Sequence, residues 1–315
     1  MKKQILVIVG PTAVGKSALA VRLAKKFNGE VISADSRQVY RGLNIGTGKI
    51  IKKEMRGVPH HLLDVAEPNK QFSAADFVRL GRAVIADIMA RGRTPIICGG
   101  TGFYISALLG EISLSSTPPN PKLRARLLKK SAAALFAILK KLNPAQAKKI
   151  DLNNPCRLIR AIEIASYLYK HKNLAEKQHT LTLSDSNKLV YPTWELNSQV
   201  IKIGMTLPPE KLKEKIRTRL LAQIKTGMVA EAKHLHKNSL SWKRMEELGL
   251  EYRYLSRFLR GKISKNEMVE KLVTEIWRYA KRQMTWFKRD KTIRWFNPND
   301  SKNPKQFSLL RRHFW

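Results

Sequence analysis

The octapeptide Gly-Pro-Thr-Ala-Val-Gly-Lys-Ser at residues 10–17 constrains the fold of this chain more than any other feature. It fits the phosphate-binding pattern G-x-x-x-x-G-K-[ST] without a mismatch. A continuous apolar run at residues 5–9 precedes it, and residues 17–27 follow with helical periodicity. A buried strand, a glycine loop and a helix in this order predict an α/β fold with a parallel sheet of the P-loop NTPase type, flanked by helices.

The residue types in the loop indicate that it binds phosphate. Its glycines let successive backbone N–H groups point toward phosphate oxygens, and the positive N-terminus of the next helix adds to their effect. Lys16 supplies a point charge, and the Ser17 hydroxyl can bind Mg²⁺. We predict that a diphosphate or a nucleotide such as ATP binds Gly10, Pro11, Thr12, Ala13, Val14, Gly15, Lys16 and Ser17.

Two further predicted strands indicate where the rest of the site lies. Residues 30–34 lead to Asp35, and residues 94–98 lead to the string GGTG at 99–102. Ligands of open α/β sheets bind at the carboxyl ends of strands, so Asp35 could deprotonate a nucleophile and Thr101 could donate to a ligand. The structural alternatives are an N-cap or a purely structural acid for Asp35, and a cap of the following helix for Thr101. The third strand ends without the carboxylate that an ordinary ATPase places there.

The composition changes at residues 113–121, SLSSTPPNP, which indicates a linker or a domain edge. Residues 200–207 are again apolar and predict a strand that returns to the sheet. We therefore predict a P-loop α/β core made of residues 1–113 and 191–315. A mostly helical insertion would occupy residues 114–190.

Four further stretches show helical patterns. Residues 123–141 and 144–169 of the insertion are helical and strongly basic, whereas residues 210–237 and 266–288 predict two long helices of the core.

The charge of the chain predicts a polyanionic partner. Sixty Lys and Arg residues against 24 Asp and Glu give a net charge of +36, which favours nucleic acid over the alternative of mere solubility. No run approaches the roughly 18 apolar residues of a membrane span. Cys98 and Cys156 have no zinc-ligand or disulfide spacing, so we expect a cytoplasmic protein without a membrane partner. We also expect a monomer, because no exposed apolar stripe stands out.

Seven strings recur in the order known from one protein family. They are GPTAVGKS (10–17), ISADSRQVYRGLNIGTGK (32–49), VPHHLLD (58–64), FSAADF (72–77), CGGTGFY (98–104), RLIRAIE (157–163) and YAKRQMTW (279–286). Through them the chain resembles the tRNA dimethylallyltransferases, also called tRNA isopentenyltransferases, of bacterial type. The resemblance covers nearly the whole chain. It implies transfer of a dimethylallyl group from dimethylallyl diphosphate to the exocyclic amine (N6) of the adenine 3′-adjacent to the anticodon in tRNA, releasing pyrophosphate.

The resemblance also implies roles for single residues. Asp35, Thr101 and Lys16 would be catalytic: Asp35 as the base for the amine, Thr101 in contact with the target nucleotide, and Lys16 on the diphosphate with Mg²⁺ at Ser17. Arg219 matches an arginine near the diphosphate. The anticodon stem-loop of tRNA would contact Asp35, Ser36, Arg37, Gln38, Thr101, Leu123, Arg157, Leu158, Ile159, Arg160, Ala161, Gly249 and Arg253.

Three alternatives remain open from the residues. An adenylate isopentenyltransferase would keep the fold and use a free nucleotide, but a small acceptor needs neither the charge of +36 nor the insertion. A P-loop small-molecule kinase would use Asp35 as the base for a hydroxyl and would turn over ATP without RNA. A non-enzymatic RNA-binding P-loop protein would bind tRNA with strong salt dependence and form no product.

Overall fold

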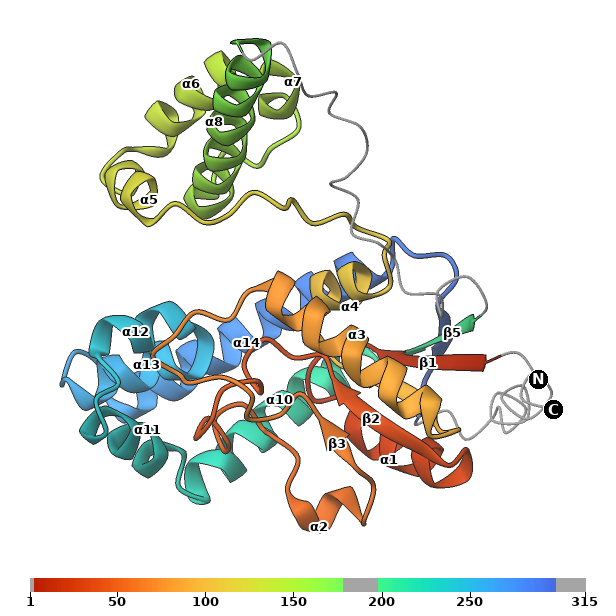
Figure 1. The fold of residues 1–315 in the computed structure, drawn as a ribbon. Coiled ribbons are helices and arrows are strands. Elements are labelled where there is room, and N and C mark those ends of the chain that lie inside the picture. The colour runs from red at the N-terminus through yellow and green to blue at the C-terminus, as the bar shows by residue number, and fades with distance from the viewer. Residues whose placement is uncertain (1–2, 178–197, 299–315) are drawn as a thin grey trace. The chain divides into compact units, whose positions relative to one another are not determined.

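A computed structural model describes residues 3–177 and 198–298 (Figure 1). Its contacts divide the chain into two compact units. The larger unit, which we call the core unit, consists of Met1–Ile112 and Tyr191–Trp315, and the smaller, helical unit is Ser113–Val190. No helix among the described residues is long and apolar enough to span a membrane.

Six strands of the core unit form one sheet in the order β3-β2-β4-β1-β5-β6, and every pairing is parallel. The strands are β1 (Lys3–Val9), β2 (Gly29–Ser33), β3 (His60–His61), β4 (Thr94–Cys98), β5 (Ser198–Met205) and β6 (Arg294–Phe296). In the middle of the sheet, Val7 of β1 is aligned with Ile97 of β4 and Lys202 of β5. The predicted fold class, a P-loop-type parallel sheet with flanking helices, is confirmed.

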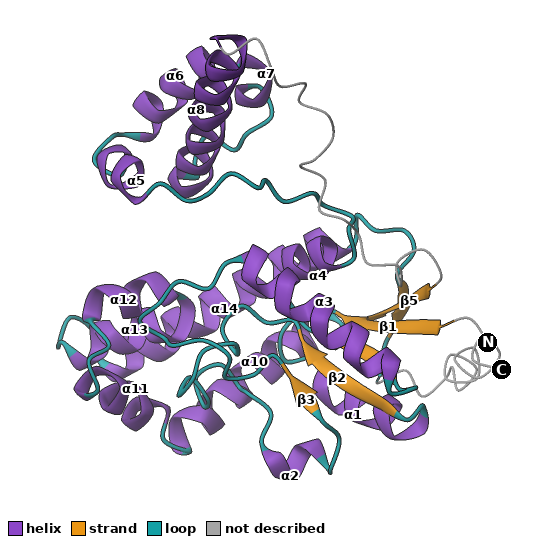
Figure 2. Cartoon of the chain, in the orientation of Figure 1, coloured by secondary structure: helices purple, strands orange, loops and turns teal. Residues whose placement is uncertain are grey.

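Helices lie beside the strands throughout the core unit (Figure 2). They are α1 (Lys16–Lys26), α2 (Lys52–Met55), α3 (Ala74–Ala90), α4 (Gly102–Leu108), α10 (Pro209–Lys225), α11 (Met228–Lys237), α12 (Trp242–Leu248), α13 (Leu250–Leu259) and α14 (Lys265–Phe287). The chain crosses the sheet in one direction through α1 and returns through α3. Right-handed crossovers therefore place these two helices on opposite faces.

Local sequence explains where the helices begin and end. Ser73 caps α3 by accepting a hydrogen bond from the Asp76 N–H, 3.2 Å away, and the Asp76 side chain accepts from the Ser73 N–H in return. The prediction of one helix over residues 210–237 was wrong. Gly227, with a φ of 107°, adopts the left-handed region and separates α10 from α11.

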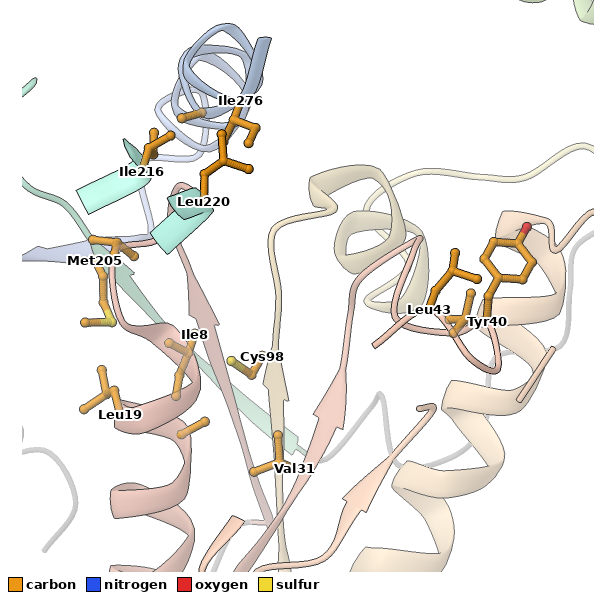
Figure 3. Packing of buried hydrophobic residues seen from close by; sticks show 14 of the residues in the cluster. Ile8, Leu19, Val31, Tyr40, Leu43, Cys98, Met205, Ile216, Leu220 and Ile276 are labelled. Atoms are coloured by element: carbon orange, nitrogen blue, oxygen red, sulfur yellow. The ribbon is translucent and has the colours of Figure 1, made fainter. Parts of the chain in front are cut away.

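In the core unit, buried apolar side chains of the strands pack against those of the flanking helices. Figure 3 shows Ile8 of β1 and Leu19 of α1 near Met205 of β5, with Leu220 of α10 and Ile276 of α14 close by. All five side chains are at most 4% exposed. The loops at the carboxyl ends of the strands are therefore supported by a close-packed interior.

The helical unit contains α5 (Pro121–Leu127), α6 (Ala132–Leu142), α7 (Pro144–Ala147) and α8 (Pro155–Lys177). Helix α6 packs on α8, and the two share a separate hydrophobic core around Leu135, Leu139 and Leu158. Each stretch predicted as one helix is thus two helices. Asn143 is the N-cap of α7: its side chain accepts a hydrogen bond from the Gln146 N–H, and Pro144 is the first residue of that helix.

Candidate active site

A cavity of about 250 Å³ in the core unit lies where β1, β2 and β4 end. Most of the predicted phosphate-loop residues line it together with the predicted base. The lining includes Thr12, Ala13, Gly15, Lys16, Ser17, Asp35, Gln38 and Arg219. The fold thus brings into one space residues that lie more than 200 positions apart in the sequence.

The glycine loop takes its shape from close backbone approach and left-handed residues. A Cβ at Gly10, whose φ is 139°, would lie 2.3 Å from the Met205 carbonyl oxygen, so only glycine fits there. Gly15, with a φ of 99°, immediately precedes α1. The N-terminus of α1 therefore begins at Lys16 on the wall of the cavity, as a phosphate site requires.

Lys16 is the main titratable cation of the loop. Its Nζ donates to the Pro11 carbonyl oxygen at 2.8 Å. Burial lowers the pKa of Lys16 to about 8, although the nearby Asp35 carboxylate opposes part of the change and Arg219 adds to it. Cys98 lines the same cavity, and burial raises the pKa of its thiol to about 11. At neutral pH the cavity therefore holds a cationic lysine and a neutral thiol.

The affinity for inorganic pyrophosphate is expected to fall as the pH rises through about 8. Lys16 is a cation below its pKa and neutral above it, so its attraction for the anion is present at neutral pH and lost in alkali. Calorimetry on the wild type and on Lys16→Met at each pH cancels the titration of the ligand itself. The ratio of the wild-type affinity to the Lys16→Met affinity for pyrophosphate should shrink about tenfold between about pH 7 and about pH 9.5. A constant advantage would contradict a contact between Lys16 and phosphate.

Asp35 is held by a turn of its own backbone. Its Oδ1 accepts hydrogen bonds from the Arg37 N–H at 2.8 Å and the Gln38 N–H at 3.3 Å. The turn fixes the orientation of the carboxylate at the end of β2. No helix begins within this turn, so Asp35 is not an N-cap. Its two hydrogen bonds make it a structural acid of the turn as well as the candidate base.

Thr101 connects the end of β4 to the Asp35 turn. Its N–H donates to the Ala34 carbonyl oxygen at 3.2 Å, and its Oγ1 accepts from the Ser36 N–H at 3.0 Å. Thr101 is the N-cap residue of α4, but its side chain makes no capping bond to that helix and binds the Ser36 N–H instead. Thr101 lies beside the residue that follows the predicted base.

Arg219 of α10 closes the cavity from another side. Its Cζ would lie 3.3 Å from a Cβ built on Gly48, so the guanidinium packs against the loop at residues 46–48. Lys215, one turn earlier on α10, lies with Arg219 along a groove outside the cavity. The structure thus places Arg219, and not Lys215, in the cavity wall.

A carboxylate that the sequence analysis did not single out shapes the neighbouring loop. Glu231 of α11 accepts from the N–H groups of Asn44, Ile45 and Gly46 at 2.9, 2.7 and 3.0 Å, and from the Tyr252 hydroxyl at 2.7 Å. This loop leads directly to Thr47 and Gly48 in the cavity lining. Glu231 therefore holds the loop that forms this part of the cavity wall, although it does not itself belong to the residues named as the lining.

Three predicted tRNA contacts of the core unit meet at one place. A Cβ on Gly249 would lie 3.8 Å from Arg253 Nη2 and 3.9 Å from Arg37 Nη2. Arg253 Nε also donates to the Glu246 carbonyl oxygen at 3.3 Å. Glu251 next to them is buried, which raises its carboxyl pKa to about 7. Two guanidinium groups thus flank a position without a side chain, an arrangement that suits an RNA backbone.

The predicted tRNA contacts of the helical unit have mixed surroundings. Arg157 is exposed and Leu123 is half-buried. Leu158, Ile159 and Ala161 are 0%, 5% and 3% exposed and lie in the core of this unit. Their side chains therefore stabilise the unit and are not available to tRNA. A string shared with a family identifies matching positions, but it does not show which of their side chains are buried.

Arg160 also has a structural role. It forms an ion pair with Glu163 and donates to the Thr117 carbonyl oxygen at 2.9 Å. Glu163 is 1% exposed and also accepts from Arg124 Nη2 at 2.8 Å. Burial alone would raise the pKa of Glu163, but these hydrogen bonds and one from the Asn120 N–H lower it to about 2.

Glu163→Gln is expected to destabilise the helical unit by roughly 2–3 kcal/mol, because it leaves two arginines without their carboxylate. Hydrogen exchange of the α8 amides in the full chain measures this loss, with the exposed Asp151→Asn as the control. In the wild type the stabilisation is present above pH 4.5 and should disappear as the pH falls toward about 2. Equal protection in both variants would show that the ion pairs contribute nothing.

Two residues of α14 that line the cavity, Tyr279 and Gln283, had no role predicted from the sequence. Gln283 Oε1 accepts from the Thr12 N–H at 2.8 Å, and its Nε2 donates to the Gly100 carbonyl oxygen at 2.9 Å. The Tyr279 hydroxyl interacts with the Thr101 side chain, and burial raises the pKa of Tyr279. Their spacing of four residues puts both on one helix face, which was the available signal.

A parallel sheet, a glycine loop at a helix N-terminus and a carboxylate in the same cavity define a P-loop protein that binds a phosphorylated ligand. The model of one family, described as IPP transferase, matches residues 38–290. The chain belongs to the IPP transferase family, which confirms the resemblance inferred from its strings.

Similar proteins carry names that agree with this assignment. A tRNA dimethylallyltransferase 2 from Treponema denticola is 43% identical over 289 residues, covering 91% of this chain and 92% of the relative. The crystal structure of full-length tRNA isopentenylpyrophosphate transferase from Bacillus halodurans has a TM-score of 0.70 at 35% identity, covering 99% of this chain and 96% of that chain. A structure of a eukaryotic dimethylallyltransferase acting on tRNA has a TM-score of 0.75 at 26% identity, covering 98% and 78%.

Proposed function

We propose that this protein, acting as a monomer, is a tRNA dimethylallyltransferase. It transfers the dimethylallyl group of dimethylallyl diphosphate to N6 of the adenine 3′-adjacent to the anticodon, and pyrophosphate is released. The observation that carries the proposal is the cavity in which Lys16 and the glycine loop lie with Asp35, in a chain of the IPP transferase family.

The glycine loop would bind the diphosphate of the donor. Backbone N–H groups, the α1 N-terminus, Lys16 and Arg219 offer positive potential to the phosphate oxygens. This potential stabilises the negative charge that grows on the leaving group as the bond between the allylic carbon and its oxygen breaks. Even with its pKa lowered to about 8, Lys16 is mostly cationic at neutral pH, and a bound anion favours that form further.

Asp35 would accept the proton of the amine. The N6 lone pair of adenine forms the new bond to the allylic carbon, the carbon–oxygen bond to the diphosphate breaks, and one amine proton moves to the carboxylate. The turn at residues 35–38 holds this carboxylate in place before any substrate binds. A base stacked in an RNA loop cannot reach a cavity of this kind, so the adenine must be turned out of the stack.

The donor atoms in the cavity fit Mg²⁺. Among the described residues no three His, Cys, Asp or Glu side chains gather as a metal site. Mg²⁺ commonly binds one or two protein oxygens and completes its shell with substrate phosphates and water, and the exposed Ser17 hydroxyl offers such an oxygen. When bound there, Mg²⁺ would neutralise charge on the departing pyrophosphate.

The alternatives explain fewer of these features. A free-nucleotide acceptor leaves the net charge of +36 and the paired arginines at Gly249 unused. A kinase or ATPase usually has a second acidic strand end for Mg²⁺, and β4 ends in Cys98 followed by glycines.

The test uses three acceptors with labelled dimethylallyl diphosphate and Mg²⁺. The first is an unmodified anticodon stem-loop with adenine 3′ of the anticodon, the second carries purine, without the amine, at that position, and the third is AMP. Label in the first RNA alone supports the proposal. Label in AMP indicates the free-nucleotide enzyme, and tight RNA binding without label indicates a binding protein.

A further inference from the structure

Helix α14 reaches the ends of two central strands through one amide side chain. Gln283 is 5% exposed, and both ends of its amide are used by backbone groups. It accepts from the Thr12 N–H in the glycine loop and donates to the Gly100 carbonyl oxygen after β4. A Cβ on Gly100 would lie 2.1 Å from Gln283 Nε2, so the contact is close and needs glycine opposite the amide.

One turn earlier, Tyr279 extends the same set of contacts toward the base. Its hydroxyl interacts with the Thr101 side chain, whose Oγ1 accepts from the Ser36 N–H at 3.0 Å. Ser36 follows Asp35 directly. A continuous series of hydrogen bonds and short backbone links therefore joins Thr12, through Gln283 and residues 100–101, to Asp35.

Backbone hydrogen bonds join the end of β2 to the loop after β4 more firmly than they join the glycine loop to that loop. The strands lie in the order β2-β4-β1, and their pairing ends at Ser33↔Cys98 and Ile8↔Cys98. Beyond that level the Ala34 N–H donates to the Cys98 carbonyl oxygen at 2.8 Å, and the Thr101 N–H donates to the Ala34 carbonyl oxygen at 3.2 Å. Between β1 and the loop after β4 there is one such bond, from the Gly99 N–H to the Ile8 carbonyl oxygen at 3.1 Å. Gln283 of α14 adds a cross-link between the glycine loop and the loop after β4, where the pairing of β1 with β4 stops.

Simple packing does not account for an amide at this position. A buried polar group has to be satisfied, and an apolar side chain of the same length would fill the space without that requirement. The two partners of Gln283 belong to the loop that would hold the diphosphate and to the loop that precedes Thr101. The amide is suited to set the spacing between these loops.

We propose that Gln283, assisted by Tyr279, is a positioning residue that fixes the distance between the diphosphate-binding loop and Asp35. The inference rests on the transferase function proposed above. Each substrate can still bind when the bridge is removed, but the transfer needs both loops in register at once. A displacement of about 1 Å between reacting groups can cost roughly 10²-fold in rate.

The test compares Gln283→Met, which keeps the length without the amide, and Gln283→Asn, which keeps the amide at a shorter length. Tyr279→Phe removes the hydroxyl alone, and Glu270→Gln on the exposed part of α14 is the control. Single-turnover transfer is measured with saturating donor and stem-loop RNA. The affinity for inorganic pyrophosphate and the melting temperature are measured on the same samples.

The transfer rate should fall roughly 10–100-fold in both Gln283 variants and less in Tyr279→Phe, while pyrophosphate affinity changes less than about threefold. Transfer within about threefold of wild type in every variant would overturn the inference. So would an equal fall in rate and pyrophosphate affinity, because Gln283 would then serve the glycine loop alone. If the Gln283 variants fail to fold, Tyr279→Phe decides in the same way. An inactive wild type would instead reject the proposed function itself.

The coupling between the two loops has its own signature. Combining Gln283→Met with Thr101→Val should lower the transfer rate by much less than the product of the separate effects, since both break one connected series of bonds. Multiplicative effects would show that the two residues act independently and would overturn the inference.

Discussion

Asp35→Asn is expected to lower the single-turnover transfer rate by roughly 10²–10⁴-fold, the range that general-base catalysis contributes. An asparagine side-chain oxygen can still accept from the Arg37 and Gln38 N–H groups, so the turn survives. Only the capacity to accept the amine proton is lost. The measurement is label transfer into stem-loop RNA at saturating donor, with RNA affinity determined alongside.

Asp76→Asn provides the matched control for this substitution. Asp76 is a half-buried carboxylate in the first turn of α3, outside the cavity lining. It should transfer at the wild-type rate and lose only a little stability through its capping box. If Asp35→Asn transferred as fast as Asp76→Asn, Asp35 would not be the base.

Lys16→Met should lower both the transfer rate and pyrophosphate affinity, the rate by roughly 10²–10³-fold. The lysine would contact phosphate oxygens whose negative charge increases as the carbon–oxygen bond breaks, so its contribution is larger in the transition state than in the bound donor. Rapid-quench kinetics and calorimetry with inorganic pyrophosphate measure the two effects separately.

Lys25→Met is the control on the same helix. Lys25 is exposed in the last turn of α1, far along the helix from the loop. It should leave pyrophosphate affinity unchanged, which separates the local contact of Lys16 from the general effect of removing one positive charge. An equal loss in both variants would mean that long-range electrostatics, and not a contact, accounts for binding.

The elements that could be predicted from sequence are those encoded by neighbouring residues. A β-branched run, a glycine loop and an amphipathic stretch specify β1, the loop and α1 within some 25 residues. The position of Asp35 followed as well, because parallel strands end at one edge of a sheet. The shared strings then supplied the family, which the comparisons confirm.

The features that escaped prediction depend on tertiary contacts. Gln283 meets Thr12 across 271 positions, and Glu231 meets Ile45 across 186, so no local pattern reveals either pair. The string at residues 157–163 shows a second limit of sequence reasoning. It suggested a segment that contacts tRNA, but it did not distinguish the exposed Arg157 from the buried Leu158 or reveal the ion pair of Arg160 with Glu163.

The measurement that tests the central claim most directly is a rapid-quench single turnover with wild-type protein, labelled dimethylallyl diphosphate, Mg²⁺ and unmodified anticodon stem-loop. Prenylated RNA and pyrophosphate are counted at each time point. We expect the two to appear at the same rate and in equal amounts, with the label on N6 of the adenine 3′ of the anticodon. Pyrophosphate released without label in RNA, or label on any other atom, would contradict the account.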